Sequence, residues 1–216
     1  MMPAEASKAD QAAPPAQAPV AIVHDYLTQR GGAERVVLAL ATEAFPGAPV
    51  HTSMYDPEGT FTGFSQLEVH TLWLDRIGWL RRHHRLSLPL LGWGFSSLEV
   101  PAQVAVCSSS GWAHRARVAG RKVVYCHSPA RWLYQPERYL GAAYRLVGSP
   151  WELYTKRARL QDRRAALSAH RYVVNSSAVR DRVRDLYQID AEVVAPPVSF
   201  GAFGPEEPVA GVEPGF

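Results

Sequence analysis

The sequence predicts an α/β fold built on a doubly wound, mostly parallel, Rossmann-like sheet. Short apolar runs at residues 20–23, 104–107 and 122–126 are typical of buried strands, and each run stops at small or polar residues. Segments with helical spacing of apolar residues alternate with these runs. Because neighbouring parallel strands need crossover connections, this alternation favours a parallel sheet with helices between its strands.

The expected elements follow one another along the chain. Strands are predicted at residues 20–23, 49–54, 67–72, 104–107, 122–126, 172–174 and 191–195. Gly31 and Gly32 precede a helix over residues 33–45. A second helix is predicted from Ser149, as the start of a capping box, to about residue 169, and a third is capped by Asn175 or Ser176.

Length and composition favour one globular domain. The chain has 216 residues, of which 47% are hydrophobic and 20% charged. We expect a disordered leader at residues 1–19, because this stretch has neither a basic start nor a continuous apolar core. The domain spans residues 20–198, and residues 199–216 are rich in Gly, Pro, Glu and Ala, as in a linker. The absence of a run of roughly 18 to 20 apolar residues, and two cysteines placed in strands (Cys107 and Cys126), favour a cytoplasmic protein.

The charge pattern gives weaker indications. A net charge of +3 does not demand a nucleic-acid partner, and the basic run at residues 156–164 spreads around a predicted helix, so none is expected. Residues 76–95 mix basic and aromatic side chains, which fits either peripheral contact with a membrane or a packed helix with a solvated basic edge. His83 and His84 have no carboxylate at ligand spacing, so we expect no metal site.

The carboxyl ends of the predicted strands carry the candidate site residues. An open parallel sheet binds its ligands in the crevice beyond these ends, so His127 and Arg131 after one strand, and Asp25 and Tyr26 after another, favour a small-molecule enzyme. Each residue also has an ordinary structural alternative. The histidine could be a satisfied structural group, the arginine part of a surface ion pair and the aspartate a local cap.

Three sequence blocks together resemble the amino-terminal domain of family 4 retaining glycosyltransferases. They are residues 23–37 (VHDYLTQRGGAERVV), 125–132 (YCHSPARW) and 174–198. The resemblance implies one half of a GT-B fold, in which this domain holds the acceptor and a second Rossmann-like domain holds the nucleotide sugar. No glutamate here has another glutamate eight residues on, which is the pair that the second domain supplies in that family. The resemblance therefore implies that residues 199–216 lead toward a donor domain absent from this sequence.

The resemblance also implies roles for individual residues. His127 is the expected catalytic residue, and Gly31 and Gly32 are expected to bind the donor diphosphate, because bare backbone at a helix amino terminus favours anions. The residues expected to bind the acceptor are Asp25, Tyr26, Ser109 and Arg131. No cofactor is expected; the donor is a nucleotide sugar, with GDP-mannose as one candidate.

The expected function is therefore retaining transfer of a hexose, with mannose as one candidate, to a glycan or a lipid-linked acceptor in cell-envelope polysaccharide assembly. The expected partners are these two substrates, the inner face of the membrane and a separately encoded donor domain. The alternative is a non-catalytic acceptor-binding module or a truncated remnant that acts with a separate donor domain.

Overall fold

The computed structural model describes residues 18–78, 88–136 and 144–198. Residues 1–17 of the predicted leader, the predicted linker at 199–216, and His83 and His84 lie outside the described residues. The first strand begins at Ala18, so it includes two residues that the sequence had assigned to the leader.

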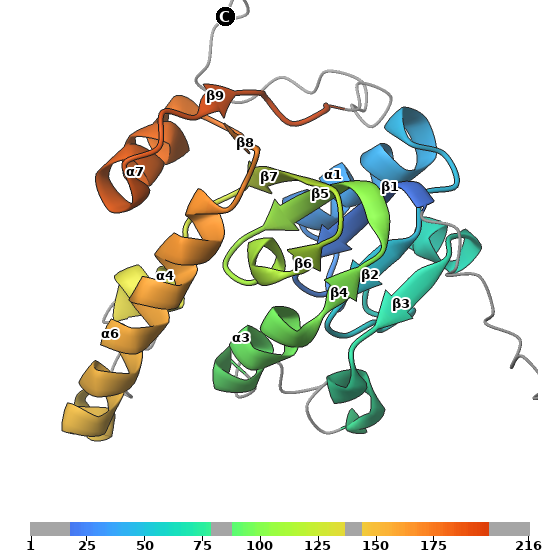
Figure 1. The fold of residues 1–216 in the computed structure, drawn as a ribbon. Helices are drawn as coiled ribbons and strands as arrows, with labels where there is room; N and C mark the ends of the chain where they lie inside the picture. Colours follow the sequence, from blue (N-terminus) through green and yellow to red (C-terminus); the bar gives the residue numbers. More distant parts are fainter. Residues whose placement is uncertain (1–17, 79–87, 137–143, 199–216) are drawn as a thin grey trace, which may run out of the picture.

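Seven strands form one all-parallel sheet (Figure 1). In spatial order they are β3 (Val69–Thr71), β2 (Val50–Thr52), β1 (Ala18–His24), β5 (Ala102–Ser109), β7 (Arg121–Cys126), β8 (Arg171–Val174) and β9 (Glu192–Val193). Each of the seven predicted strands is found in this sheet, so the Rossmann-like prediction is confirmed. Two further strands, β4 (Glu99–Val100) and β6 (Arg117–Val118), form a separate pair that is too short to leave a sequence pattern.

Helical segments connect the strands. They are α1 (Gly32–Ala39), which continues as the π-helix η1 (Leu40–Ala44), the 3-10 turns η2 (Thr62–Gln66), η3 (Trp73–Arg76) and η5 (Ala113–Arg115), and the helices α3 (Leu88–Ser97), α4 (Arg131–Tyr134), α6 (Tyr144–Leu167) and α7 (Ser177–Tyr187). Ser176, one of the two predicted candidates, occupies the N-cap position of α7, but its hydroxyl makes no capping hydrogen bond and donates to Oδ1 of Asn175 instead. The capping-box prediction is wrong, because α6 already begins at Tyr144 and Ser149 lies inside it. Pro150 removes one backbone hydrogen bond from α6, yet the helix extends to both sides of it.

Helices cover both faces of the sheet. Along β1, Ile22 points into a core shared with Val37 of α1 and with Phe64 of η2. Its neighbours Ala21 and Val23 point into a larger core on the other face, formed with buried side chains of α3, α6 and α7. This alternation is the doubly wound arrangement expected from the sequence.

Both cysteines are buried and free. Burial raises the pKa of Cys107 and that of Cys126 to about 12, so both behave as small apolar side chains. Among the described residues, no helix combines the length and the apolar character that a bilayer span requires.

The strand order changes direction at β1. The chain passes from β1 to β2 and β3 on one side and then returns to β5 on the other side of β1. The parallel register sets His24 beside Ser108, and Ser108 beside Tyr125, so the carboxyl ends of β1, β5 and β7 are level. In open α/β sheets the ligand crevice lies at such a switch point.

Candidate functional site

A cavity of about 320 Å³ lies beyond the carboxyl ends of β1, β5 and β7. Its lining residues are Tyr26, Ser110, Trp112, His127, Ser128, Arg131, Trp132 and Arg182. Three predicted site residues, Tyr26, His127 and Arg131, are therefore brought together, although they lie up to 105 positions apart (131 minus 26) in the sequence. The volume is at the lower end of the range for small-molecule sites, which is about 300 to 1,000 Å³.

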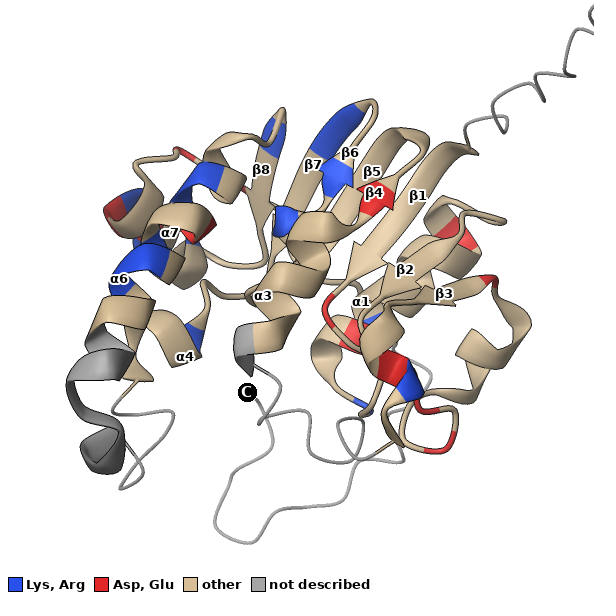
Figure 2. Cartoon of the chain, turned by 60° about the horizontal axis from the view of Figure 1, so that its bottom comes forward, with Lys and Arg blue, Asp and Glu red and all other residues tan. Residues whose placement is uncertain are grey.

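A smaller cavity of about 170 Å³ adjoins the first. Ser128, Arg131 and Arg182 line both cavities, and the smaller one adds Asp185 and Leu186 of α7. Figure 2 shows Lys and Arg gathered on the half of the molecule formed by β7, β8, α6 and α7, and Asp and Glu around the β2 and β3 half. Arg182 of α7, which lines both cavities, belongs to the more basic half.

Two stacked indoles form part of the wall of the larger cavity. The rings of Trp112 and Trp132 are nearly parallel, with an interplanar angle of 8° and centroids 5.6 Å apart. Both side chains are buried. Tyr26 lies 6.5 Å from Trp112, tilted by 57°. Aromatic side chains beside a few polar groups are typical of the lining of small-molecule sites.

A line of polar side chains joins the first strand to His127. Nδ1 of His24 lies 3.1 Å from both the carbonyl oxygen and Oγ of Ser108. The same Oγ lies 2.8 Å from Nε2 of His127. On the other side, Nε2 of His24 lies 3.8 Å from Oε1 of Glu34 in α1. His127 is therefore held in place from β5, and its Nε2 is engaged within the protein.

His127 is neutral at physiological pH. Burial lowers its pKa to about 4, and the nearby His24 adds to this lowering, while Glu34 opposes it. An imidazole in this state can donate one hydrogen bond and accept another. It does not carry a positive charge to a ligand at pH 7.

Asp25 is directed into the protein rather than into the cavity lining. Its carboxylate accepts hydrogen bonds from the backbone N–H groups of Ser110, Trp112 and Ala113, at 2.5, 3.0 and 2.6 Å. Burial raises the pKa of Asp25, against the lowering effect of His24 and of these three amides. The geometry thus matches the local-cap alternative, and Asp25 shapes the loop that forms one wall of the cavity.

Ser109 also points away from the cavity. Its Oγ lies 2.8 Å from Nδ1 of His114, and Nε2 of His114 lies 3.0 Å from Oδ1 of Asp162 in α6. The other carboxylate oxygen of Asp162 accepts hydrogen bonds from the hydroxyls of Tyr134 and Tyr187. All of this network is buried or half-buried, so it ties α6 and α7 to the sheet.

The glycine pair lies outside the lining of the cavity. Gly31 is the N-cap of α1, and a Cβ there would collide with the Glu34 carboxylate, so the bare backbone is occupied from within the chain. A Cβ at Gly32 would meet no atom within 4 Å. Burial alone would raise the pKa of Glu34, but His24, the backbone N–H of Glu34 and the Gln29 side chain together outweigh it and lower the pKa, so the amino terminus of α1 already carries a carboxylate.

Several lining residues had no role predicted from the sequence. Arg182 lies on the polar face of α7, where a solvated arginine is the ordinary expectation. Trp112 follows a serine-rich turn with no apolar periodicity to place it. The signal that could have found Arg182 is its place in the helix that follows β8, because such a helix begins at the carboxyl edge of the sheet.

Comparison with protein-family models, with curated proteins and with solved structures found no match for this chain. Within residues 18–78, 88–136 and 144–198, no three His, Cys, Asp or Glu side chains gather as metal ligands do.

Proposed function

We propose that residues 20–198 form the acceptor-side domain of a retaining glycosyltransferase that transfers a hexose from a nucleotide sugar. One observation carries this proposal: the cavity at the switch point of the sheet combines His127, Tyr26 and Arg131 with two stacked tryptophans. Hydroxyls, a neutral imidazole and aromatic faces suit a sugar, which presents both polar edges and an apolar face.

His127 acts in this proposal as a hydrogen-bonding group. Its Nε2 is engaged by Ser108, so its remaining polar atom, Nδ1, is the one that can meet a sugar hydroxyl. The neutral ring has one N–H group and one bare nitrogen, so it can hydrogen-bond a sugar hydroxyl while the charge at the reacting carbon changes. It does not first have to release the second proton that an imidazolium would carry. The charge that develops on a leaving diphosphate requires other groups.

The set of residues that would bind the donor is less complete than the set that would bind the acceptor. Gly31 and Gly32 remain the proposed contacts of the donor diphosphate, and the open space beside Gly32 supports this role. Glu34 reduces the attraction of this helix terminus for anions. A separate donor domain would then have to supply the cations for the diphosphate, and such a domain, with GDP-mannose as one candidate ligand, is the partner we propose.

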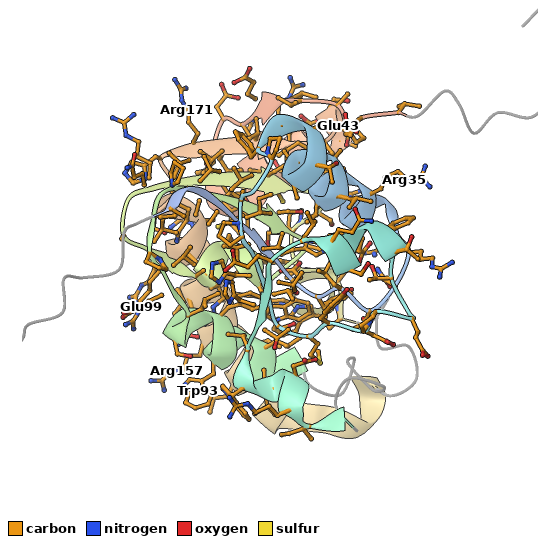
Figure 3. The ribbon with its side chains drawn as sticks, turned by 90° about the vertical axis from the view of Figure 1, so that its right-hand side faces the viewer. Arg35, Glu43, Trp93, Glu99, Arg157 and Arg171 are labelled. Carbon is orange, nitrogen blue, oxygen red and sulfur yellow. The ribbon has the colours of Figure 1, made fainter. Side chains whose placement is uncertain are left out.

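A membrane surface is the second proposed partner. Helix α3 buries Leu91 and Phe95, yet Trp93 is 63% exposed and packs edge-on against Trp73 of η3, with ring centroids 5.8 Å apart. Figure 3 shows Trp93 beside Arg157 of α6, and both line a third cavity. Exposed indoles next to guanidinium groups suit the interface of an anionic bilayer, where a lipid-linked acceptor would be found.

The test measures binding first and transfer second. Titration calorimetry of the full chain with short oligosaccharides should detect glycan binding, and His127→Asn should weaken it about tenfold, the size of one lost polar contact. The matched control is His170→Asn, since His170 is exposed and precedes β8 at the opposite edge of the sheet.

Transfer is then measured by mass spectrometry. The chain is mixed with nucleotide sugars, the bound glycan and an extract of the source cells that supplies a donor domain. Added hexose whose anomeric configuration matches the donor supports the proposal. Glycan binding without any chain-dependent transfer would establish the non-catalytic module instead, and no binding of any glycan would overturn both.

A further inference from the structure

We infer that the acceptor carries a phosphate or diphosphate group, which Arg131 and Arg182 bind together from two sides of the cavity. The sugar part of this inference rests on the proposed function. The anion site itself stands on the charges that line the cavity.

Two different helices supply the guanidinium groups. Arg131 is the first residue of α4, directly after β7, and Arg182 lies in α7, directly after β8. Because β7 and β8 are adjacent and parallel, the two connections leave the sheet at the same edge. Both side chains line both of the adjoining cavities. Two planar donors that reach one space from separate elements can contact different oxygens of one anion.

Neither arginine is neutralised by a described acidic side chain. Elsewhere on α7, Arg180 and Arg184 lie 3.6 and 3.7 Å from the Asp181 carboxylate. Within residues 18–78, 88–136 and 144–198, no ion pair involves Arg131 or Arg182. The arginines on this helix therefore differ: two have a carboxylate partner, and the one that faces the cavity has none.

The other lining groups are donors or neutral. The described lining of the 320 Å³ cavity contains no Asp or Glu, while the hydroxyl of Ser110 can donate to an oxyanion. The buried indole N–H of Trp112 has no acceptor among the described residues, so the same wall offers a further donor. Asp185 lines only the smaller cavity, which places the anion in the larger one.

The neutral state of His127 agrees with an anion that is bound by the two arginines. With its pKa lowered to about 4 by burial and by His24, the imidazole adds no charge at pH 7, so it serves the uncharged sugar. Arg131 and Arg182 then carry the attraction for the anionic group. In a glycosyl phosphate or diphosphate, an uncharged sugar is covalently bonded to such an anionic group.

The experiment compares a neutral sugar, its phosphate ester and two diphosphates. Calorimetry of the full chain at pH 7.5 and 0.1 M salt uses methyl α-glucoside, glucose 1-phosphate, inorganic diphosphate and farnesyl diphosphate. Glucose 1-phosphate should bind at least tenfold more tightly than the glucoside, as expected for charge-assisted hydrogen bonds. Arg131→Gln and Arg182→Gln should each remove most of this difference.

Arg184→Gln is the matched control, because Arg184 is on the same helix and already pairs with Asp181 and Asp190. Its phosphate affinity should change by less than twofold. Equal affinity for the glucoside and its phosphate, or an equal effect of the three arginine variants, would overturn the anion site.

The diphosphate arms separate this inference from the proposed function. Diphosphate binding that requires Arg131 and Arg182, in a chain that binds no sugar, would support the anion site and overturn the glycosyltransferase proposal. Glucoside binding without diphosphate binding would do the reverse. Tighter binding of farnesyl than of inorganic diphosphate identifies the anion as a lipid headgroup, and equal binding identifies it as a free phosphate ester; both results support the site.

Discussion

The hydroxyl of Ser108 lies 2.8 Å from Nε2 of His127. Ser108 is the seventh residue of β5, the strand between β1 and β7, so a single side chain connects the ends of three strands. On its other side the same hydroxyl lies 3.1 Å from Nδ1 of His24. A change in the orientation or the protonation of His127 would therefore alter the contact between Ser108 and His24 of the first strand.

The free energy of unfolding should fall as the pH is lowered through the titration range of His127. The pKa of His127 is lowered from 6.5 to about 4 in the folded chain, chiefly by burial. Between these values the unfolded chain binds more protons, so stability is lost as the pH decreases from 6.5 to 4 and is constant above that range. His127→Gln keeps a hydrogen-bonding group and removes this titration. Urea unfolding at pH 7.5 and 4 should show a change that is smaller by about 2 kcal/mol in the variant, after allowance for solvent screening.

The control for this experiment is replacement by Gln of His170, an exposed residue whose Nδ1 accepts a hydrogen bond from the Lys122 N–H; that variant should keep the part of the pH dependence that His127 contributes. His51 contributes a similar dependence in every variant, because burial and His70 lower its pKa to about 4 as well. An identical pH profile for the wild-type chain and His127→Gln would contradict the neutral state assigned to His127.

Asp25→Asn should destabilise the fold by about 2 to 4 kcal/mol. The carboxylate of Asp25 accepts three backbone N–H groups, whereas the Asn amide would turn a donor toward at least one of them. The measurement is urea unfolding at pH 7.5, with Asp56→Asn as control. Asp56 accepts only a long bond of 3.3 Å from the Glu58 N–H in an exposed turn, so a change within about 0.5 kcal/mol is expected there. A variant with normal stability and weakened glycan binding would instead make Asp25 an acceptor ligand.

Asp162→Asn should cost about 3 kcal/mol of stability, since it leaves His114 facing an uncharged partner in a buried network. Burial alone raises the pKa of Asp162, but His114 and the two tyrosine hydroxyls outweigh it and hold the pKa below its ordinary value. The contribution is therefore present at neutral pH and is lost in acid as the pH falls through that lowered pKa. Asp190→Asn is the exposed control, and a loss no larger than in that control would remove the structural role of the network.

The sheet could be predicted because its strands are nearly continuous apolar runs. A strand that is buried on both faces can be recognised from its own sequence, without knowledge of its neighbouring strands. The strands β5 and β7 are of this kind. The strands β4 and β6 have two residues each and are fixed by their pairing with one another, so no local pattern marks them. The prediction for the start of α6 was wrong for the opposite reason. The capping pattern at Ser149 is a strong local signal, but the backbone is already helical from Tyr144 onward.

The location of the candidate site could be predicted from the sequence more reliably than the side chains that line it. Asp25 and Tyr26 are adjacent at one strand end, yet one accepts backbone amides inside the protein and the other lines the cavity. Sequence spacing gives the strand end, while the direction of each side chain depends on the loop at residues 110–113. Arg182 shows the converse, because only the pairing of β8 with β7 places its helix beside Arg131.

The exposed tryptophans should bind the chain to anionic vesicles. Trp73 and Trp93 are 41% and 63% exposed, and the neighbouring Ile77 and Leu90 are each 42% exposed, so this surface offers aromatic and aliphatic area with Arg157 at its edge. Co-sedimentation with phosphatidylglycerol vesicles should exceed that with phosphatidylcholine vesicles and weaken with added salt. Trp73→Ala combined with Trp93→Ala should reduce the partition coefficient about tenfold, the loss of roughly 1.4 kcal/mol of apolar transfer. Leu167→Ala, on an equally exposed part of α6, should leave it unchanged; equal effects of both variants would mean non-specific adsorption rather than docking through α3.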